Sequence, residues 1–266
     1  MVITKTLLRK GEEHKIFCQD FFYNQEFDDI IISAVFDGCS NQENESYRDE
    51  SQFISNLSAK IFKSICPTII NDFQQIDPKL ILYNIITRYF NELKFFRDYL
   101  NLCEDELLTT VLLCVYNKSS DSGHIISLGD GYVSVNGDIK DILNGKKTDL
   151  NPDGGVEYPI QFLDKYTVSD HVLSEFLKNF KDQWSFENLK DVVISTDGIT
   201  SWELKNPDKN TIKSATDFLA NDNMFYKQPI MLDRKFNQLI YNGWRNKDDV
   251  GIIRLIKLED DILPIE

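Results

Sequence analysis

The sequence predicts an α+β fold in which antiparallel sheets carry helices on their outer faces. Three observations support this prediction. Short segments rich in β-branched and aromatic residues recur along the chain, two long helical segments lie between them, and strands and helices do not alternate as in a parallel βαβ fold. We expect a single domain over residues 1–266, because no linker, change in composition or internal repeat divides the chain.

Residues 1–37 predict three strands, VITKTLLRKG, KIFCQDFFY and DDIIISAVFDG, because each run is short and is bounded by Gly, Asn or Asp. Two helices follow. Pro67 is expected to end the first helix, and the second is expected to open near Pro78. Apolar residues recur at helical spacing in both: Phe53, Leu57, Ile61 and Ile65 in the first, and Leu82, Ile86, Tyr89, Leu93, Phe96 and Leu100 in the second.

Further strands are predicted in the second half of the chain. The Asn136-Gly137 pair suits a two-residue hairpin turn, and Gly129-Asp130-Gly131 marks another turn. Residues 141–160 are polar and rich in turn residues, which predicts a loop or a flap inserted in the domain. The expected elements are strands at 108–117, 124–140 and 191–198, a helix near 230–241, and a last strand in DDVGIIRLIKL.

The composition limits the classes of partner. The net charge of −14 and the pI near 4.7 oppose binding to nucleic acid or to an anionic membrane, and the chain has no run of about 18 apolar residues that could cross a bilayer. The five cysteines show no CxxC spacing, so we expect free thiols in a reducing, cytoplasmic compartment. An acidic chain binds phosphate only where a metal ion or a basic group reverses the local charge.

Apolar runs meet an aspartate at several places in the chain. Each such site taken alone is most simply a turn, because Asp and Gly are turn residues. A carboxylate at the rim of a buried strand nevertheless carries a desolvation cost, and Gly directly after it allows a ligand or another backbone to approach closely. The five sites are KIFCQD ending at Asp20, ISAVFDG at Asp37, IISLGDG at Asp130, VVISTDG at Asp197, and Asp248-Asp249 before VGIIRL.

If the strand ends are neighbours, these carboxylates repel one another unless divalent cations neutralise them. Ligation by oxygen alone favours hard ions such as Mg²⁺ or Mn²⁺ over zinc. The pattern therefore predicts two cations that share one carboxylate, an arrangement that activates water for in-line attack on phosphorus.

The ordered set CQD, VFDG, LGDG, STDG and KDDVGIIRL resembles the motifs of the metal-dependent protein phosphatase 2C family, over residues 10 to 257. The second motif, Asp-Gly-Cys-Ser, is most similar to a bacterial branch of that family. The resemblance implies a four-layer α-β-β-α sandwich of two antiparallel sheets flanked by helices, with a binuclear metal centre at one end of the sheets.

The resemblance also implies a role for each matching residue. Asp37 would bridge the two ions, and the Gly38 carbonyl would bind one of them. Asp197 and Asp248 would hold one ion, Asp20 would help to hold the other, and Gln19 would contact water near it. Asp130, with Asp197, would hold a weaker third ion.

Two positions depart from the family pattern. The family often has a His after Asp-Gly that protonates the leaving oxygen, and here Cys39, a poor acid at neutral pH, takes that position. The family also often has an Arg before the first Asp that binds the phosphate, and here the local basic residues are His14 and Lys15. Lys15 is either a phosphate-binding residue or a solvated strand residue, and His14 is equally well a surface histidine. We expect His124 and His171 to be structural.

The sequence thus predicts a Mg²⁺- or Mn²⁺-dependent phosphatase acting on phosphoserine or phosphothreonine in proteins, with Asp37, Asp197 and Lys15 as catalytic residues. A phosphorylated protein is the expected partner, and nucleic acid and membranes are not. Two alternatives stay open: a non-catalytic binding or regulatory module of the same fold, and the same chemistry on a non-protein phosphoester. The sequence leaves the oligomeric state undetermined.

Overall fold

The computed structural model describes most of the chain. The described residues are 1–14, 17–39, 48–72, 77–143, 156, 158–166, 170–207, 211–221 and 232–258.

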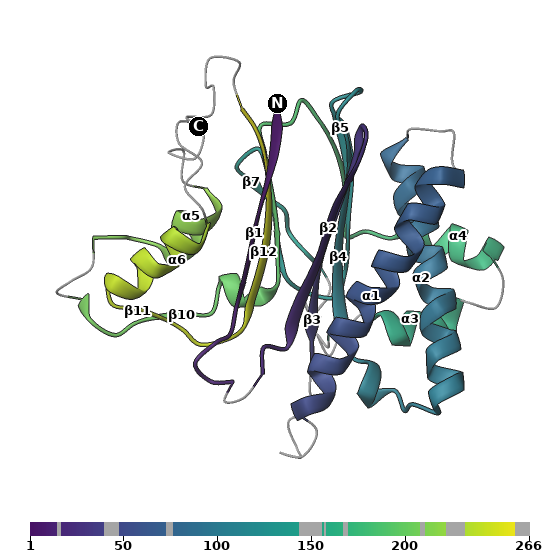
Figure 1. The fold of residues 1–266 in the computed structure, drawn as a ribbon, viewed down its shortest axis with the longest axis horizontal. Coiled ribbons are helices and arrows are strands. Elements are labelled where there is room, and N and C mark those ends of the chain that lie inside the picture. Colours follow the sequence, from purple (N-terminus) through teal and green to yellow (C-terminus); the bar gives the residue numbers. More distant parts are fainter. Residues whose placement is uncertain are drawn as a thin grey trace.

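Two five-stranded antiparallel sheets face each other, and helices cover the outer face of each (Figure 1). The first sheet has the order β1-β12-β9-β6-β7 and the second has the order β2-β3-β4-β5-β8. The four layers confirm the predicted α+β sandwich. The first sheet consists of β1 (Val2–Arg9), β12 (Val250–Lys257), β9 (Asp191–Ser195), β6 (Tyr132–Val135) and β7 (Asp138–Ile139); the second consists of β2 (Asp20–Phe27), β3 (Ile30–Gly38), β4 (Thr109–Asn117), β5 (Ser122–Leu128) and β8 (Gln183–Glu187).

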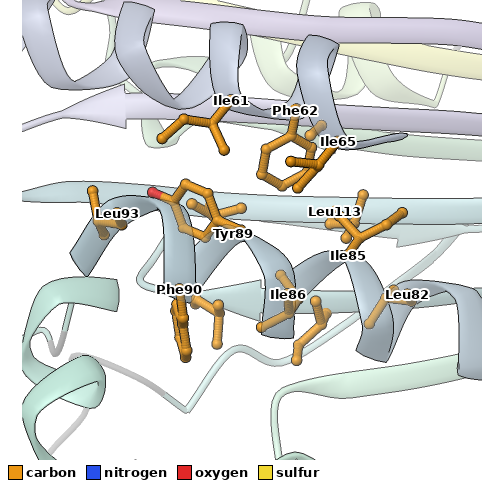
Figure 2. Close-up of a cluster of buried hydrophobic side chains, with 14 of the residues drawn as sticks. Ile61, Phe62, Ile65, Leu82, Ile85, Ile86, Tyr89, Phe90, Leu93 and Leu113 are labelled. Carbon is orange, nitrogen blue, oxygen red and sulfur yellow. The ribbon is translucent and has the colours of Figure 1, made fainter. Parts of the chain in front are cut away.

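Helices α1 and α2 pack antiparallel on the second sheet, with two shorter helices beside them (Figure 1). Figure 2 shows their core, in which Phe62 from α1 and Tyr89 from α2 meet Leu113 of β4. The first sheet is covered instead by α5 and α6, and a two-stranded ribbon, β10–β11, lies beside it. The bounds are α1 (Arg48–Asp72), α2 (Pro78–Leu100), α3 (Pro159–Tyr166), α4 (Asp170–Asn179), α5 (Ala215–Ala220), α6 (Leu232–Tyr241), β10 (Trp202–Leu204), β11 (Trp244–Asn246) and the 3₁₀ turns η2 (Asp105–Leu107) and η3 (Asp197–Ile199).

A third apolar cluster fills the space between the sheets, with Val35 and Leu112 from the second sheet against Val133, Ile194 and Ile253 from the first. The central strands are therefore buried on both faces. Burial on both faces explains why these strands read as continuous apolar runs in the sequence, without the alternation of a half-exposed strand.

The helix predictions are partly wrong. Pro67 does not end α1, which continues to Asp72, because Cys66 and Ile69 are buried in the core and hold the last turns in place. Packing thus outweighs the cost of about 3 kcal/mol for a proline inside a helix. The apolar stripes of both helices are also shorter than expected, since Phe53 at the start of the first and Leu100 at the end of the second are exposed. The start of α2 at Pro78 is confirmed, with Asp77 as its N-cap.

The turn predictions are confirmed in the described residues. Asn136 and Gly137 both have positive φ, as a two-residue turn between β6 and β7 requires. The predicted flap at 141–160 lies mostly outside the described residues, but α3 already begins at Pro159. Among the described helices, none is both long and apolar enough to cross a membrane.

Candidate metal centre

Asp20 and Asp37 lie directly opposite each other at one end of the second sheet, because β2 begins where the antiparallel β3 ends. The sequence predicted a strand KIFCQDFFY with Asp20 in its middle, whereas in the structure Asp20 is the first residue of β2. Asp20 is buried, and its Oδ2 accepts a hydrogen bond from the Thr196 hydroxyl at 2.7 Å. Asp37 is partly exposed. The register of two antiparallel strands therefore brings both carboxylates to the same edge.

The Asp-Gly pair at 197–198 has a structural cause. Gly198 lies so close to β12 that a Cβ built on it would be 1.6 Å from the carbonyl oxygen of Asp249. Only glycine permits this approach. It places Asp197, the first residue of η3, beside the turn that carries Asp248.

Asp130 lies in the turn where the chain leaves β5 of the second sheet and enters β6 of the first. The glycines on both sides, Gly129 and Gly131, have positive φ. A Cβ on Gly131 would be 2.8 Å from the carbonyl oxygen of Ser195. The two glycines therefore let the turn cross between the sheets close to the end of β9.

The electrostatics show that the five carboxylates form one cluster. Burial, and then the charges of Asp20, Asp197, Asp248 and Asp130, raise the pKa of Asp37 well above its usual value. Burial and the charges of Asp248 and Asp130 raise the pKa of Asp197 to about 6. Burial is also the largest cause of the raised pKa values of Asp20, Asp130 and Asp248. The structure thus brings together all five aspartates that the sequence singled out.

Asp249 plays a part that the sequence analysis did not assign. Its side chain is buried, with Oδ1 accepting a hydrogen bond from the Gly11 amide at 2.7 Å and Oδ2 accepting one from the Gln19 amide. The His14 Nδ1 lies 2.7 Å from the same Oδ2. Asp249 therefore ties the segment before β2 to the segment before β12. The Asp248-Asp249 doublet was the available signal, but it did not show which carboxylate points inward.

His14 is half-buried between the two carboxylates of this doublet, with Nε2 at 3.4 Å from the Asp248 Oδ1. The hydrogen bond with Asp249 raises the pKa of His14. This contact gives His14 a defined partner, unlike a surface histidine. Lys15 and Ser40 lie outside the described residues.

Cys39 follows the Asp37-Gly38 corner, and its amide donates to the Leu108 carbonyl at 3.0 Å. Burial raises the pKa of the Cys39 thiol well above its usual value, so the sulfur keeps its proton. The Tyr158 side chain is hydrogen-bonded to this thiol. Sequence reasoning missed Tyr158, because no motif marks a tyrosine in a turn-rich segment as a neighbour of Cys39.

The donor set fits hard divalent cations in its chemistry. It consists of carboxylates and a backbone carbonyl. The carboxylates repel one another, and a bound divalent cation relieves this repulsion. Within the part of the chain that the structure describes, no three His, Cys, Asp or Glu side chains already converge on a point where they could hold an ion.

Known proteins resemble this chain in structure. No family model and no curated protein matches the sequence. Three similar solved structures are RsbX in complex with magnesium (17% identity, TM-score 0.51, covering 96% of this chain and 94% of that one), a serine/threonine phosphatase of S. agalactiae (12%, 0.56, 97% and 100%) and the catalytic domain of the serine/threonine phosphatase PstP with two manganese ions (11%, 0.53, 97% and 99%). The chain therefore has the protein phosphatase 2C-like fold.

Proposed function

We propose that this chain is a Mg²⁺- or Mn²⁺-dependent serine/threonine protein phosphatase that hydrolyses phosphomonoesters. The observation that carries the proposal is the cluster of Asp20, Asp37, Asp130, Asp197 and Asp248, which raise one another's pKa values at one end of two facing sheets. The fold and the metal ions named with two of its structural neighbours support it.

In this proposal, two or three cations would be held by the site. Bound cations would offset the charge of the phosphoryl oxygens and activate a water for direct attack on phosphorus. The ligands would be Asp20, Asp37, Asp130, Asp197, Asp248 and the Gly38 carbonyl.

The chain's own residues hold this donor set in place. The Thr109 hydroxyl donates to the Asp37 carbonyl at 2.8 Å, and the Asp37 amide donates to the Thr110 hydroxyl at 3.3 Å. Both threonines begin β4, so the corner that carries Asp37 is fixed from the neighbouring strand. Lys15 would bind the phosphate of the substrate. The buried Cys39 thiol is too weak an acid to protonate the leaving oxygen well, so we expect slow turnover.

A non-catalytic module of the same fold is the second candidate. It is favoured by Cys39 at the position of the usual acid and by the lack of three converged ligand side chains among the described residues. The retention of all five aspartates argues against it, because loss of metal-ligand positions is the expected mark of an inactive relative. Activity on a non-protein phosphoester is a variant of the first proposal.

The remaining parts of the proposal concern the whole protein. We expect residues 1–266 to act as one domain with a phosphorylated protein as substrate and no role in binding nucleic acid. The five free cysteines suit a cytoplasmic location.

The decisive experiment is hydrolysis of p-nitrophenyl phosphate and of a phosphothreonine peptide, with Mn²⁺ and then with excess chelator. We expect turnover that requires the ion, and a loss of at least about 100-fold in Asp37→Asn with the fold retained. Asp138→Asn is the matched control, since Asp138 is an exposed acid on β7. Turnover that persists in chelator, or full activity of Asp37→Asn, would contradict the mechanism. A Mn²⁺-binding protein without turnover would favour the non-catalytic module.

A further inference from the structure

The segment that precedes His14 is docked on the turn that precedes β12. Two backbone amides of residues 11–13 donate to carbonyls of residues 246–249, each at 3.0 Å. Gly11 packs so closely on this turn that a Cβ built on it would be 2.2 Å from the carbonyl carbon of Asp248. Only glycine permits this approach. The backbone that leads to His14 is therefore held beside Asp248 by contacts that do not involve the imidazole ring.

The imidazole of His14 lies between two acids that differ in how firmly they are held. Its Nδ1 is 2.7 Å from the Asp249 Oδ2, and its Nε2 is 3.4 Å from the Asp248 Oδ1. The Asp249 side chain is 1% exposed and accepts two backbone amides, whereas the Asp248 side chain is 40% exposed. Carboxylate oxygens only accept hydrogen bonds, so a ring that donates from both nitrogens links the anchored acid to the more exposed one.

The contacts of Asp248 fall on one of its two carboxylate oxygens. Oδ1 accepts a hydrogen bond from the Asp249 amide at 2.8 Å, and the same atom faces the His14 Nε2. Neither contact uses Oδ2. Asp248 can therefore bind a cation through Oδ2 while Oδ1 is held from the side of the protein.

We propose that His14 is a positioning residue of the candidate metal centre, which links Asp248 to the buried Asp249 and so fixes the orientation in which Asp248 binds a cation. This inference rests on the proposed function. An exposed side chain loses rotamer freedom when it binds an ion, and a contact that orients it beforehand reduces this cost. Removal of a group that orients a metal ligand commonly weakens metal affinity by a factor of ten or more.

The first test measures Mn²⁺ affinity, from the electron paramagnetic resonance signal of the free ion, in two variants that each keep one of the two contacts. In His14→Asn the amide nitrogen can replace Nδ1, and no atom replaces Nε2. In His14→Gln the amide nitrogen can replace Nε2. We expect about tenfold weaker Mn²⁺ binding in His14→Asn and a loss of less than threefold in His14→Gln. Parent-like affinity in His14→Asn, or an equal loss in both variants, would overturn the proposal.

Glu12→Gln is the matched control in the same segment, because the Glu12 carboxylate contacts Arg245. Its Mn²⁺ affinity should stay within about twofold of the parent. A tenfold loss in this variant as well would show that any change in the segment weakens the site, and would overturn the assignment to His14. The thermal midpoint of His14→Asn in chelator should lie within about 2 °C of the parent, since the contact with Asp249 is kept.

The second test asks whether His14 acts through Asp248. In an Asp248→Asn background, His14→Asn should weaken Mn²⁺ binding less than twofold further, because the ligand that His14 orients has already been changed. The same tenfold loss in both backgrounds would show that His14 acts by another route, and would overturn the proposal.

The third test does not depend on metal. Three-bond couplings between the Hα and Hβ nuclei of Asp248, measured by nuclear magnetic resonance in chelator, report its χ1 rotamers. We expect one dominant rotamer in the parent and averaging over several in His14→Asn. Unchanged couplings would overturn the positioning role. If the parent binds no Mn²⁺, the proposed function fails, and these couplings still decide whether His14 holds Asp248.

Discussion

The carboxylate cluster has two parts that differ in how the protein treats charge. In the inner part, Asp249 and Asp20 are almost fully buried and are met by hydrogen-bond donors from the Gly11 and Gln19 amides and the Thr196 hydroxyl. In the outer part, the four partly exposed acids face one another's charge: Asp37, Asp130, Asp197 and Asp248.

This difference separates the structural role of Asp249 from the metal-binding role proposed for the outer acids, while Asp20 shares features of both, because it is hydrogen-bonded by Thr196 and is also repelled by neighbouring carboxylates. Buried carboxylates that accept several hydrogen bonds connect segments of the chain, and their removal leaves donors unsatisfied. Acids that repel one another do not stabilise the folded state when no cation is bound. Their assembly at one site therefore indicates that a cation normally offsets the repulsion. The two parts should therefore respond in opposite directions when a carboxylate is removed.

The largest expected effect is on the inner part. Asp249→Ala leaves two buried amides without an acceptor, and we expect the free energy of unfolding to fall by about 3–5 kcal/mol. Urea denaturation in chelator measures it. Asp248→Ala, at the neighbouring outer residue, should change stability by no more than about 1 kcal/mol. Equal losses in the two variants would remove the distinction between the parts.

Cation binding should stabilise the protein through the outer part. At a Mn²⁺ concentration about 100 times the dissociation constant, the free energy of unfolding should rise by about 2.7 kcal/mol. Asp37→Asn should lose most of this gain, and Asp138→Asn should keep it, because Asp138 lies on β7 outside the cluster. Thermal melts with and without Mn²⁺ report the gain. Equal stabilisation of Asp37→Asn and the parent would mean that the ion binds elsewhere.

Removing charge from the outer part should stabilise the metal-free protein. The folded-state pKa of Asp197 is raised from 3.8 to about 6, so its ionisation destabilises the folded state as pH rises through that range. Asp197→Asn should add about 1–2 kcal/mol at pH 7, since solvent screens part of the repulsion. The gain should vanish below about pH 4, where Asp197 is protonated in both states. Denaturation at both pH values in chelator measures it, and a loss of stability at pH 7 would contradict the electrostatic account.

The outer part was largely predictable from sequence, and the inner part was not. An aspartate at the end of a buried strand, followed by glycine, is a local pattern, and three of the five aspartates show it: Asp37, Asp130 and Asp197. Whether Asp248 or Asp249 points inward depends on the register of β12 against its neighbours. The contact between Tyr158 and Cys39 depends on where α3 packs. Such facts are tertiary, and neither spacing nor composition contains them.

The fold shows the same division. The strands and the two long helices follow from apolar patterning, and the hairpin at Asn136-Gly137 follows from turn chemistry. Pro67 was misjudged because the rule that proline ends a helix is local, whereas buried residues beyond it keep α1 helical. Phe53 and Leu100 were misjudged because helical spacing does not reveal how far the partner surface extends.

The smallest expected effect is on the turnover rate. Cys39→His places an imidazole beside the Asp37 corner, and a positioned acid helps only when the leaving oxygen needs a proton. We expect turnover of a phosphoserine peptide to rise about fivefold, which corresponds to a lowering of the activation free energy by about 1 kcal/mol. This rise is smaller than the one that a well-placed general acid gives, because the site is shaped for the smaller thiol. Turnover of p-nitrophenyl phosphate should not change, since p-nitrophenolate leaves without protonation.

Cys103→Ser, at the exposed cysteine, is the control. Equal rises on both substrates would indicate that the imidazole acts on binding or charge, and no rise on either would show that the leaving oxygen obtains its proton from another group.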